Sequence, residues 1–225
     1  MILRIESENN KEVKGVELPF KESLYEHSDV VSKVTRNPWS GEVFCSSSWD
    51  GSIQFWSFKE SVIDFVKSIS VGKPVYDSLW FTKDLIISSS ATLDKGMVSQ
   101  IDVRTRDVKV IIESDNATRA ICRVNENLIA TIWDSHKIIL TDMRSTKESI
   151  QTIESDTKLH ALDLIKEDVL LIGCDHVVRL WDVKSNKEIW RNAVLEADAI
   201  NAVTALSNSV FAYSTMDGTL SINRI

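Results

Sequence analysis

A repeat of 40 to 44 residues is the feature of this sequence that most constrains its fold. Five segments share one order of residues: an apolar run, a run of small residues, a turn that contains an Asp, and a run in which apolar and polar residues alternate. The turn acids that mark the period are Asp50, Asp94, Asp134, Asp175 and Asp217. A period that holds over five copies predicts an array of similar structural units.

The runs inside each unit have the periodicity of β-strands. Residues Ser52, Ile53, Gln54 and Phe55 alternate between polar and apolar side chains, as they do in a strand with one buried face. Helical periodicity is weak throughout. The sequence therefore predicts an all-β fold with few helices.

Composition and charge narrow the classes of function. The chain has 225 residues, is 43% hydrophobic and has a net charge of -7, which argues against a general binder of nucleic-acid phosphates. Cys45, Cys122 and Cys174 lie in separate apolar runs without metal-ligand spacing, which predicts buried reduced thiols and an intracellular protein. No segment has the pattern of a signal peptide or a membrane span. We expect no cofactor, no metal site, no direct contact with nucleic acid and no contact with a membrane.

Units such as "EVFCSSSWDGSIQFWSF" and "DVLLIGCDHVVRLWDVKSNKEIW" resemble the WD-repeat β-propeller family. The resemblance implies a single domain over residues 1–225, with five WD-type repeats over residues 24–225, each a four-stranded antiparallel blade. The chain ends on the third strand of its last unit, so a strand within residues 1–23 is expected to complete the last blade. Five units are fewer than the usual seven, and a closed ring, an open ring and a shortened propeller all stay possible.

In WD-repeat blades the turn Asp orients a His, which reaches a Ser or Thr and then a Trp. The first unit has a candidate for every member: His27, a Ser within 46–48, Asp50 and Trp56. Because buried polar groups must be paired, a structural role for His27 is favoured over a metal-binding or catalytic one. The other units lack the His and are expected to depend more on packing. Further structural residues are Asp175, Trp181 and Asp217.

Two units place a Trp directly before the turn Asp, at Trp49 in "SSSWDG" and at Trp133 in "ATIWDS". The fold does not need an aromatic residue there, because Cys174 and Met216 take the same place in the last two units. Trp is enriched in the residues that dominate binding energy. We therefore expect Trp49 and Trp133 to lie partly exposed at the rim of one face and to bind a partner. The adjacent acids of this partner-binding site are Asp50 and Asp134.

The "SWD"-type turns in the first and third units also resemble a narrower group, the mitotic-checkpoint Bub-three and mRNA-export Rae-one family. That resemblance implies a non-enzymatic scaffold, in the nucleus at kinetochores and in the cytoplasm, that binds the acidic GLEBS motif of a checkpoint kinase or a nucleoporin. Two positions depart from the family. Thr219 and Asn201 stand where the family has Arg residues that hold phosphate, and neither can form the bidentate contacts of Arg.

Three other functions stay open: an mRNA-export or nuclear-pore propeller, a coat-like scaffold completed by a partner's strand, and a WD-repeat esterase. The esterase is the weakest of the three. The sequence has no G-x-S-x-G motif, no P-loop and no cluster with metal-ligand spacing. Asp175 and His176 are adjacent, and adjacent side chains in extended chain point apart.

Overall fold

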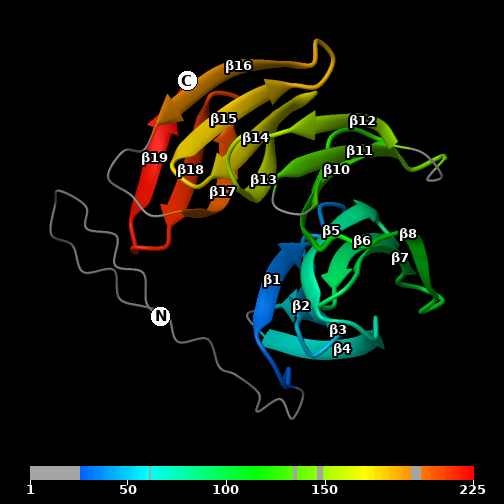
Figure 1. The fold of residues 1–225 in the computed structure, drawn as a ribbon. Coiled ribbons are helices and arrows are strands. Elements are labelled where there is room, and N and C mark those ends of the chain that lie inside the picture. Colours follow the sequence, from blue (N-terminus) through cyan, green and yellow to red (C-terminus); the bar gives the residue numbers. More distant parts are fainter. Residues whose placement is uncertain (1–25, 61, 134–135, 146–148, 194–198) are drawn as a thin grey trace, which may run out of the picture.

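The computed structural model describes residues 26–60, 62–133, 136–145, 149–193 and 199–225. Within these ranges every regular element is a β-strand, and the strands form five separate antiparallel sheets arranged in an arc (Figure 1). The fold is a five-bladed WD40-type β-propeller, so the predicted fold class is confirmed. We number the sheets blade 1 to blade 5 in chain order.

The strands of each blade follow one another in sequence from the inner strand to the outer one. Blade 1 contains β1 (Val31–Arg36), β2 (Val43–Ser48), β3 (Ser52–Lys59) and β4 (Val62–Ser70). Blade 2 contains β5 (Val75–Thr82), β6 (Leu85–Ala91), β7 (Gly96–Asp102) and β8 (Val108–Ser114). Blade 3 contains β9 (Thr118–Arg123), β10 (Leu128–Trp133), β11 (Lys137–Asp142) and β12 (Ser149–Glu154). Blade 4 contains β13 (Leu159–Lys166), β14 (Val169–Cys174), β15 (Val177–Asp182) and β16 (Lys187–Ala193). Blade 5 contains β17 (Ile200–Ser207), β18 (Val210–Thr215) and β19 (Leu220–Arg224).

Blade 5 has three strands in the described part of the chain, whereas the other blades have four. The segment that we expect to supply its outer strand, residues 1–23, lies outside the described residues. β19 therefore presents an edge without a described partner. An unpaired strand edge of this kind is a template for further strand pairing.

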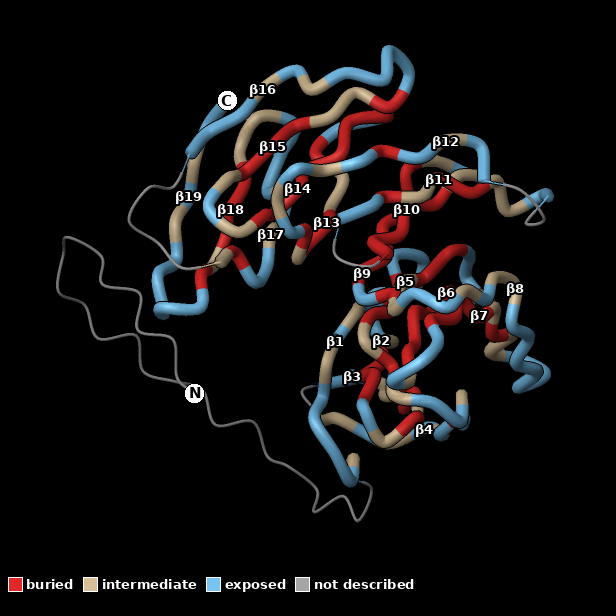
Figure 2. The backbone as a smooth tube through the Cα atoms, viewed as in Figure 1, coloured by how far each residue is buried: buried red, intermediate tan, exposed pale blue. Residues whose placement is uncertain are grey.

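The hydrophobic core lies between successive blades and comes mainly from their second and third strands (Figure 2). Between blades 1 and 2, for example, Cys45, Ile53 and Phe55 pack with Val75 and Trp80. The rings of Phe55 and Trp80 meet edge to face, with centroids 5.8 Å apart. Each blade thus covers one face of the next.

Two inner-strand carboxylates also join blades to one another. Asp77 on β5 accepts a hydrogen bond from the backbone N–H of Ile121 in blade 3 and lies 3.3 Å from the Lys33 ammonium of blade 1. Asp163 on β13 accepts one from the N–H of Ala205 in blade 5, at 2.8 Å. Burial raises the pKa of Asp77, although Lys33 acts against this shift. Such contacts fix the spacing of the blades around the axis.

The arc does not close in the described structure. The inner strands of blades 2 to 5 each pack on the blade before them, but no comparable contact joins blade 1 to blade 5 in the described ranges. Figure 1 shows β1 and β19 at the two ends of the arc, on opposite sides of an opening. The described residues thus form an open arc and not a ring closed by five blades, and both an open ring and a shortened propeller fit this arrangement.

The cysteines are free and buried, as predicted for Cys45, Cys122 and Cys174. Burial raises the pKa of the Cys45 thiol to about 12. No helix long and apolar enough to cross a membrane occurs in the residues described.

Candidate functional site

Blade 1 contains the hydrogen-bonded network expected from its sequence. His27 Nδ1 lies 2.8 Å from Asp50 Oδ2, and His27 Nε2 lies 2.8 Å from Ser46 Oγ. The indole N–H of Trp56 donates to the same Ser46 oxygen at 2.9 Å. The structure thus brings all four members together, from the chain before β1, from β2 and β3, and from the turn between β2 and β3. Both ring nitrogens of His27 are hydrogen-bonded, so neither is open to bind a metal ion.

Asp50 also organises the turn that joins β2 to β3. Its Oδ1 accepts hydrogen bonds from the N–H and the hydroxyl of Ser52, at 2.8 and 2.7 Å. The next residue, Gly51, has a φ of 81°, a conformation that a side chain would strain. Burial by itself would raise the pKa of Asp50, but the hydrogen bonds from Ser52, His27 and Ser28 outweigh it and lower the pKa to about 2.

Blade 4 has a His–Asp pair that sequence reasoning missed. His160 Nε2 lies 2.7 Å from Asp175 Oδ1, and this hydrogen bond lowers the pKa of Asp175. Our expectation that the later units lack the His was wrong for this blade. His27 lies in the chain before the inner strand, whereas His160 is the second residue of the inner strand, so a search at the His27 spacing passes over it.

The pair in blade 4 does not continue to Trp181. In blade 1, Ser46 lies two residues beyond Phe44, which is the cross-strand partner of Trp56. The matching partner of Trp181 is Leu170, and the residue two beyond it is Ile172, which has no hydroxyl. The buried indole nitrogen of Trp181 accordingly has no hydrogen-bond partner among the residues that the structure describes.

Asp217 has the local turn role that we predicted for it. Its Oδ1 accepts hydrogen bonds from the N–H of Thr219, at 3.0 Å, and from the hydroxyl of Thr215. Asn201 Oδ1 accepts the hydroxyl of Ser214 at 2.5 Å. Thr219 and Asn201 thus contribute uncharged groups to blade 5.

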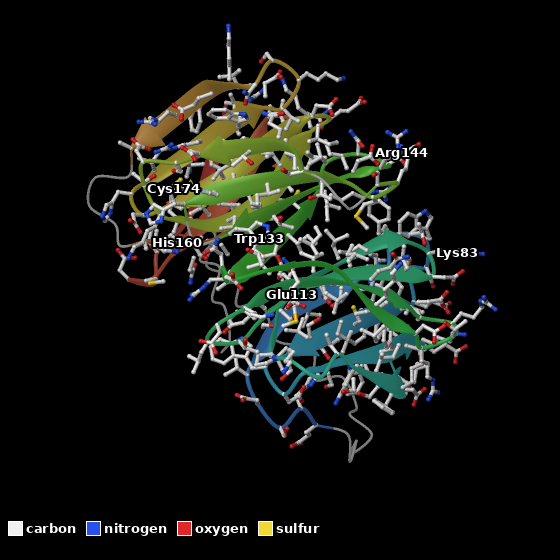
Figure 3. The ribbon with its side chains drawn as sticks, turned by 45° about the vertical axis from the view of Figure 1, so that its right-hand side comes forward. Lys83, Glu113, Trp133, Arg144, His160 and Cys174 are labelled. Atoms are coloured by element: carbon white, nitrogen blue, oxygen red, sulfur yellow. The ribbon has the colours of Figure 1, made fainter. Side chains whose placement is uncertain are left out.

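Trp133 does not lie at the exposed rim, and our expectation for its position was wrong. It is the last residue of β10, only 2% exposed, and packs among side chains of blades 2 and 3 that include Phe81 and Ile129 (Figure 3). Its indole N–H donates to Thr131 Oγ1 at 2.6 Å. Trp133 is the last residue of β10, whereas Trp49 lies one residue beyond the end of β2. Asp134 lies outside the described residues.

Trp49 does lie at the rim, with 42% of its surface exposed. Its ring lies 5.6 Å from that of Tyr76, which is the second residue of the inner strand of blade 2. The guanidinium of Arg119, the second residue of the inner strand of blade 3, lies over the Tyr76 ring, 5.9 Å from its centroid. The three side chains form a strip across three successive blades, which we call the rim strip.

The face that carries the rim strip has two further exposed apolar residues that sequence reasoning did not select. Leu93 and Met216 lie in the second-to-third-strand turns of blades 2 and 5, and both are exposed. His160 lies on the same face, because it holds in blade 4 the place that Tyr76 and Arg119 hold in blades 2 and 3. Leu93 directly precedes the turn acid Asp94, and Met216 directly precedes Asp217. A comparison of the residue before each turn acid would have selected both.

The side chains that this face presents include aromatic, apolar and cationic groups. No group of three or more His, Cys, Asp or Glu side chains is placed to hold a metal ion in the described ranges. Cys174 directly precedes Asp175, but its thiol is fully buried and burial raises its pKa, so it is not an activated nucleophile. The rim strip offers aromatic surface and a cation.

Comparisons with known proteins agree with this fold. Residues 19–57 match the family described as "WD domain, G-beta repeat". No curated protein sequence matches the chain. The crystal structure of the WD40 β-propeller domain of Doa1 is similar to 88% of this chain, with a TM-score of 0.70 and 21% sequence identity. This chain covers 65% of that structure's chain. The protein therefore contains a WD40 repeat and has the fold of a WD40 β-propeller.

Proposed function

We propose that this protein is a non-enzymatic interaction scaffold that binds an extended, acidic peptide segment of another protein along the rim strip. The observation that carries the proposal is the exposed Trp49, supported by Tyr76 and followed by Arg119. Exposed Trp, Tyr and Arg are the residue types that dominate binding energy at interfaces. Arg119 provides the positive charge that an acidic segment requires.

WD40 propellers as a class generally bind other proteins, and the finer proposal rests on the sequence resemblance to the Bub-three and Rae-one family. On that basis the peptide is a GLEBS-type motif of a checkpoint kinase or a nucleoporin. The protein would bind it at kinetochores in the nucleus or in the cytoplasm. Because Thr219 and Asn201 replace the family Arg residues, binding is proposed not to depend on a phosphate group.

The test is calorimetric titration of a synthetic GLEBS-type peptide. Trp49→Ala is expected to weaken binding about 30-fold or more, because truncation of a central interface Trp typically costs at least about 2 kcal/mol. The matched control is Trp39→Ala. Trp39 is also an exposed Trp of blade 1, but it lies between β1 and β2, at the opposite end of the strands.

Equal binding by Trp49→Ala and the parent protein would show that the peptide site lies elsewhere. A loss in both variants would point to general damage to blade 1. A phosphorylated version of the peptide is expected to bind no more than about threefold better than the unmodified one.

A further inference from the structure

We propose that the end of the blades opposite the rim strip carries a second interaction surface, which binds a short segment of a partner protein with an acidic, an apolar and a basic residue close together. The surface is centred on a hollow of about 360 Å³. Residues of blades 3 and 4 line it: Arg123, Val124, Asn125, Glu126, Leu164 and Glu167. The turns between the first and second strands lie at this end, so the hollow is separate from Trp49 and does not depend on the function proposed for the rim strip.

Arg123 forms the positive side of the hollow. Its guanidinium lies 5.0 Å from the centroid of the Phe81 ring in blade 2 and 5.7 Å from that of the Trp39 ring in blade 1. Its Nε–H donates to the carbonyl oxygen of Asn125 at 3.1 Å. The two rings and the hydrogen bond hold the guanidinium in place. Within the described residues, no carboxylate forms an ion pair with it.

Other cations at this end of the strands are paired with a carboxylate of their own blade. The pairs are Lys59–Glu42, Arg144–Asp142 and Lys184–Asp168. Arg123 is held by aromatic rings instead, so the N–H groups at the end of its guanidinium are available to a ligand. A planar guanidinium binds a carboxylate through two parallel hydrogen bonds. Arg123 is therefore the place for the acidic residue of the partner.

Glu126 and Glu167 form the negative side of the hollow. Glu126 lies in the turn between β9 and β10, and Glu167 lies in the turn between β13 and β14; both are exposed, and neither has an ion pair in the described part of the chain. The apolar lining comes from the buried Val124 and the partly buried Leu164. A Lys or Arg of the partner would meet the two carboxylates, and an apolar side chain beside it would cover Leu164.

The two signs of charge lie in a fixed order along the surface. Stacking draws the charge of Arg123 toward blades 1 and 2, whereas Glu167 belongs to blade 4. The complementary segment therefore has its acidic residue toward blade 2 and its basic residue toward blade 4. Such charge complementarity fixes the register of a bound segment and rejects segments of the wrong pattern.

Trp39 extends the surface beside Arg123 and is 50% exposed. Its turn is fixed by Asn37, which is only 5% exposed. The side-chain oxygen of Asn37 accepts the backbone N–H of Trp39 at 2.9 Å, and its amide donates to the carbonyl oxygen of Lys83 in blade 2 at 3.2 Å. The ring is thus in place before a partner arrives, which lowers the entropic cost of binding.

The test begins with a phage-displayed library of random heptapeptides. The library is first depleted on the Arg123→Ala variant, which removes peptides that bind elsewhere, and is then selected on the parent protein. We expect enriched peptides that combine Asp or Glu, a large apolar residue and Lys or Arg. The most enriched peptide is then synthesised and titrated by calorimetry.

Arg123→Lys is expected to weaken binding of that peptide about tenfold or more, because an ammonium cannot form the bidentate contact or the same ring stacking. This variant keeps the charge, so it tests the proposal even if Arg123→Ala is unstable. Trp39→Ala should weaken binding as well. The matched control is Arg144→Lys, because Arg144 lies at the same end of blade 3 but is already paired with Asp142. It should bind the peptide like the parent protein.

A charge exchange tests the other side of the hollow. Glu167→Lys is expected to weaken binding of the selected peptide, and a peptide with Glu in place of its basic residue should prefer Glu167→Lys to the parent protein. Trp49→Ala should bind the selected peptide like the parent, which separates this surface from the rim strip. The proposal is overturned if no peptide is enriched, if the enriched peptides lack an acidic residue, if Arg123→Lys binds like the parent, or if Trp49→Ala loses the peptide.

Discussion

Trp56 and Trp181 hold the same place in blades 1 and 4 but differ in the hydrogen bonding of their indole nitrogens. Trp56 donates to Ser46, Ser46 is hydrogen-bonded to His27, and His27 is hydrogen-bonded to Asp50. The buried indole N–H of Trp181 has no partner among the described residues, because Ile172 stands where a hydroxyl is needed. A buried donor without an acceptor costs free energy, whereas a paired donor contributes about 1 kcal/mol.

Replacement of each Trp by Phe separates these two situations. Trp56→Phe breaks the link to Ser46 and is expected to lower the free energy of unfolding by about 1 to 3 kcal/mol. Trp181→Phe removes an unsatisfied donor and is expected to cost less than Trp56→Phe. Urea denaturation measures both values. A larger cost at Trp181 would mean that its nitrogen has a partner in solution.

Asp50 is expected to make stability depend on pH in the acid range. Its pKa in the folded protein is about 2, below the value near 3.9 of an unfolded chain, so its ionised form stabilises the fold. That contribution, about 2 kcal/mol, is fully present above about pH 5 and is lost as the pH falls through 4 toward 2. The difference in free energy of unfolding between the parent and Asp50→Ala should therefore shrink over that interval. A difference that stays constant with pH would show that the carboxylate is not held in its charged form.

Single residues of the site were predictable where a fixed spacing defines them. His27, Asp50 and Trp56 follow a pattern in which each member sits at a set place in the repeat. The burial of Trp133 was not predictable in this way, because it depends on packing against blade 2. His160 was missed because it contacts the turn Asp from the inner strand rather than from the chain before that strand.

At the scale of elements, the start of β7 lies against the connection from β8 to β9. A Cβ on Gly96 would come within 2.2 Å of the carbonyl oxygen of Asn116 and 2.6 Å of the N–H of Thr118, and both are backbone atoms. Gly96→Ala is expected to cost about 3 kcal/mol, because the backbone must move to make room. Thermal denaturation, followed by circular dichroism, measures the effect.

Gly41 supplies the control for that variant. A Cβ there would meet only the end of the Arg36 side chain, which can move away. Gly41→Ala is therefore expected to change stability by less than about 0.5 kcal/mol. Equal effects of the two variants would contradict the close backbone approach at Gly96.

Sequence periodicity predicted the strands of each blade well, since the inner strands begin at the expected interval at Val31, Val75, Thr118, Leu159 and Ile200. Alternation of polar and apolar residues is a local property, and strands such as β4 and β16 show it, whereas β14 is buried along its whole length. The number of strands in blade 5, in contrast, is not a local property of the sequence. It depends on which distant segment pairs with β19, and no local pattern specifies that choice.

At the scale of the whole molecule, the open arc predicts that substitutions at the same place in blades 4 and 5 lower the free energy of unfolding by different amounts. Leu180→Ala leaves a cavity between blades 4 and 5 and is expected to lower the free energy of unfolding by about 2 to 5 kcal/mol. Ile222→Ala, at the same place in blade 5, is expected to cost less than about 1 kcal/mol, because Ile222 is already exposed. Urea denaturation of the isolated protein measures both. Similar losses would mean that the face of blade 5 is covered in solution.

The blade count could be predicted from the sequence, but the opening could not. Successive blades contact one another through equivalent residues of the repeat, so the repeat predicts these contacts. A contact between blade 1 and blade 5 joins the two ends of the array, and the repeat does not predict it. Whether it forms depends on the rotation between successive blades, which packing sets and the residue pattern does not state.

Because each blade packs only on its neighbours, thermal motion should be unevenly distributed along the arc. In such an array, stability is close to a sum of unit terms and junction terms, and a terminal unit has one junction fewer than an internal one. Blade 5 has one junction and three described strands, so it is the unit that opens at the lowest free energy. Amide hydrogens of β18 should exchange with deuterium sooner than those of β10, and the molecule should fray from its carboxyl-terminal end while its centre stays folded.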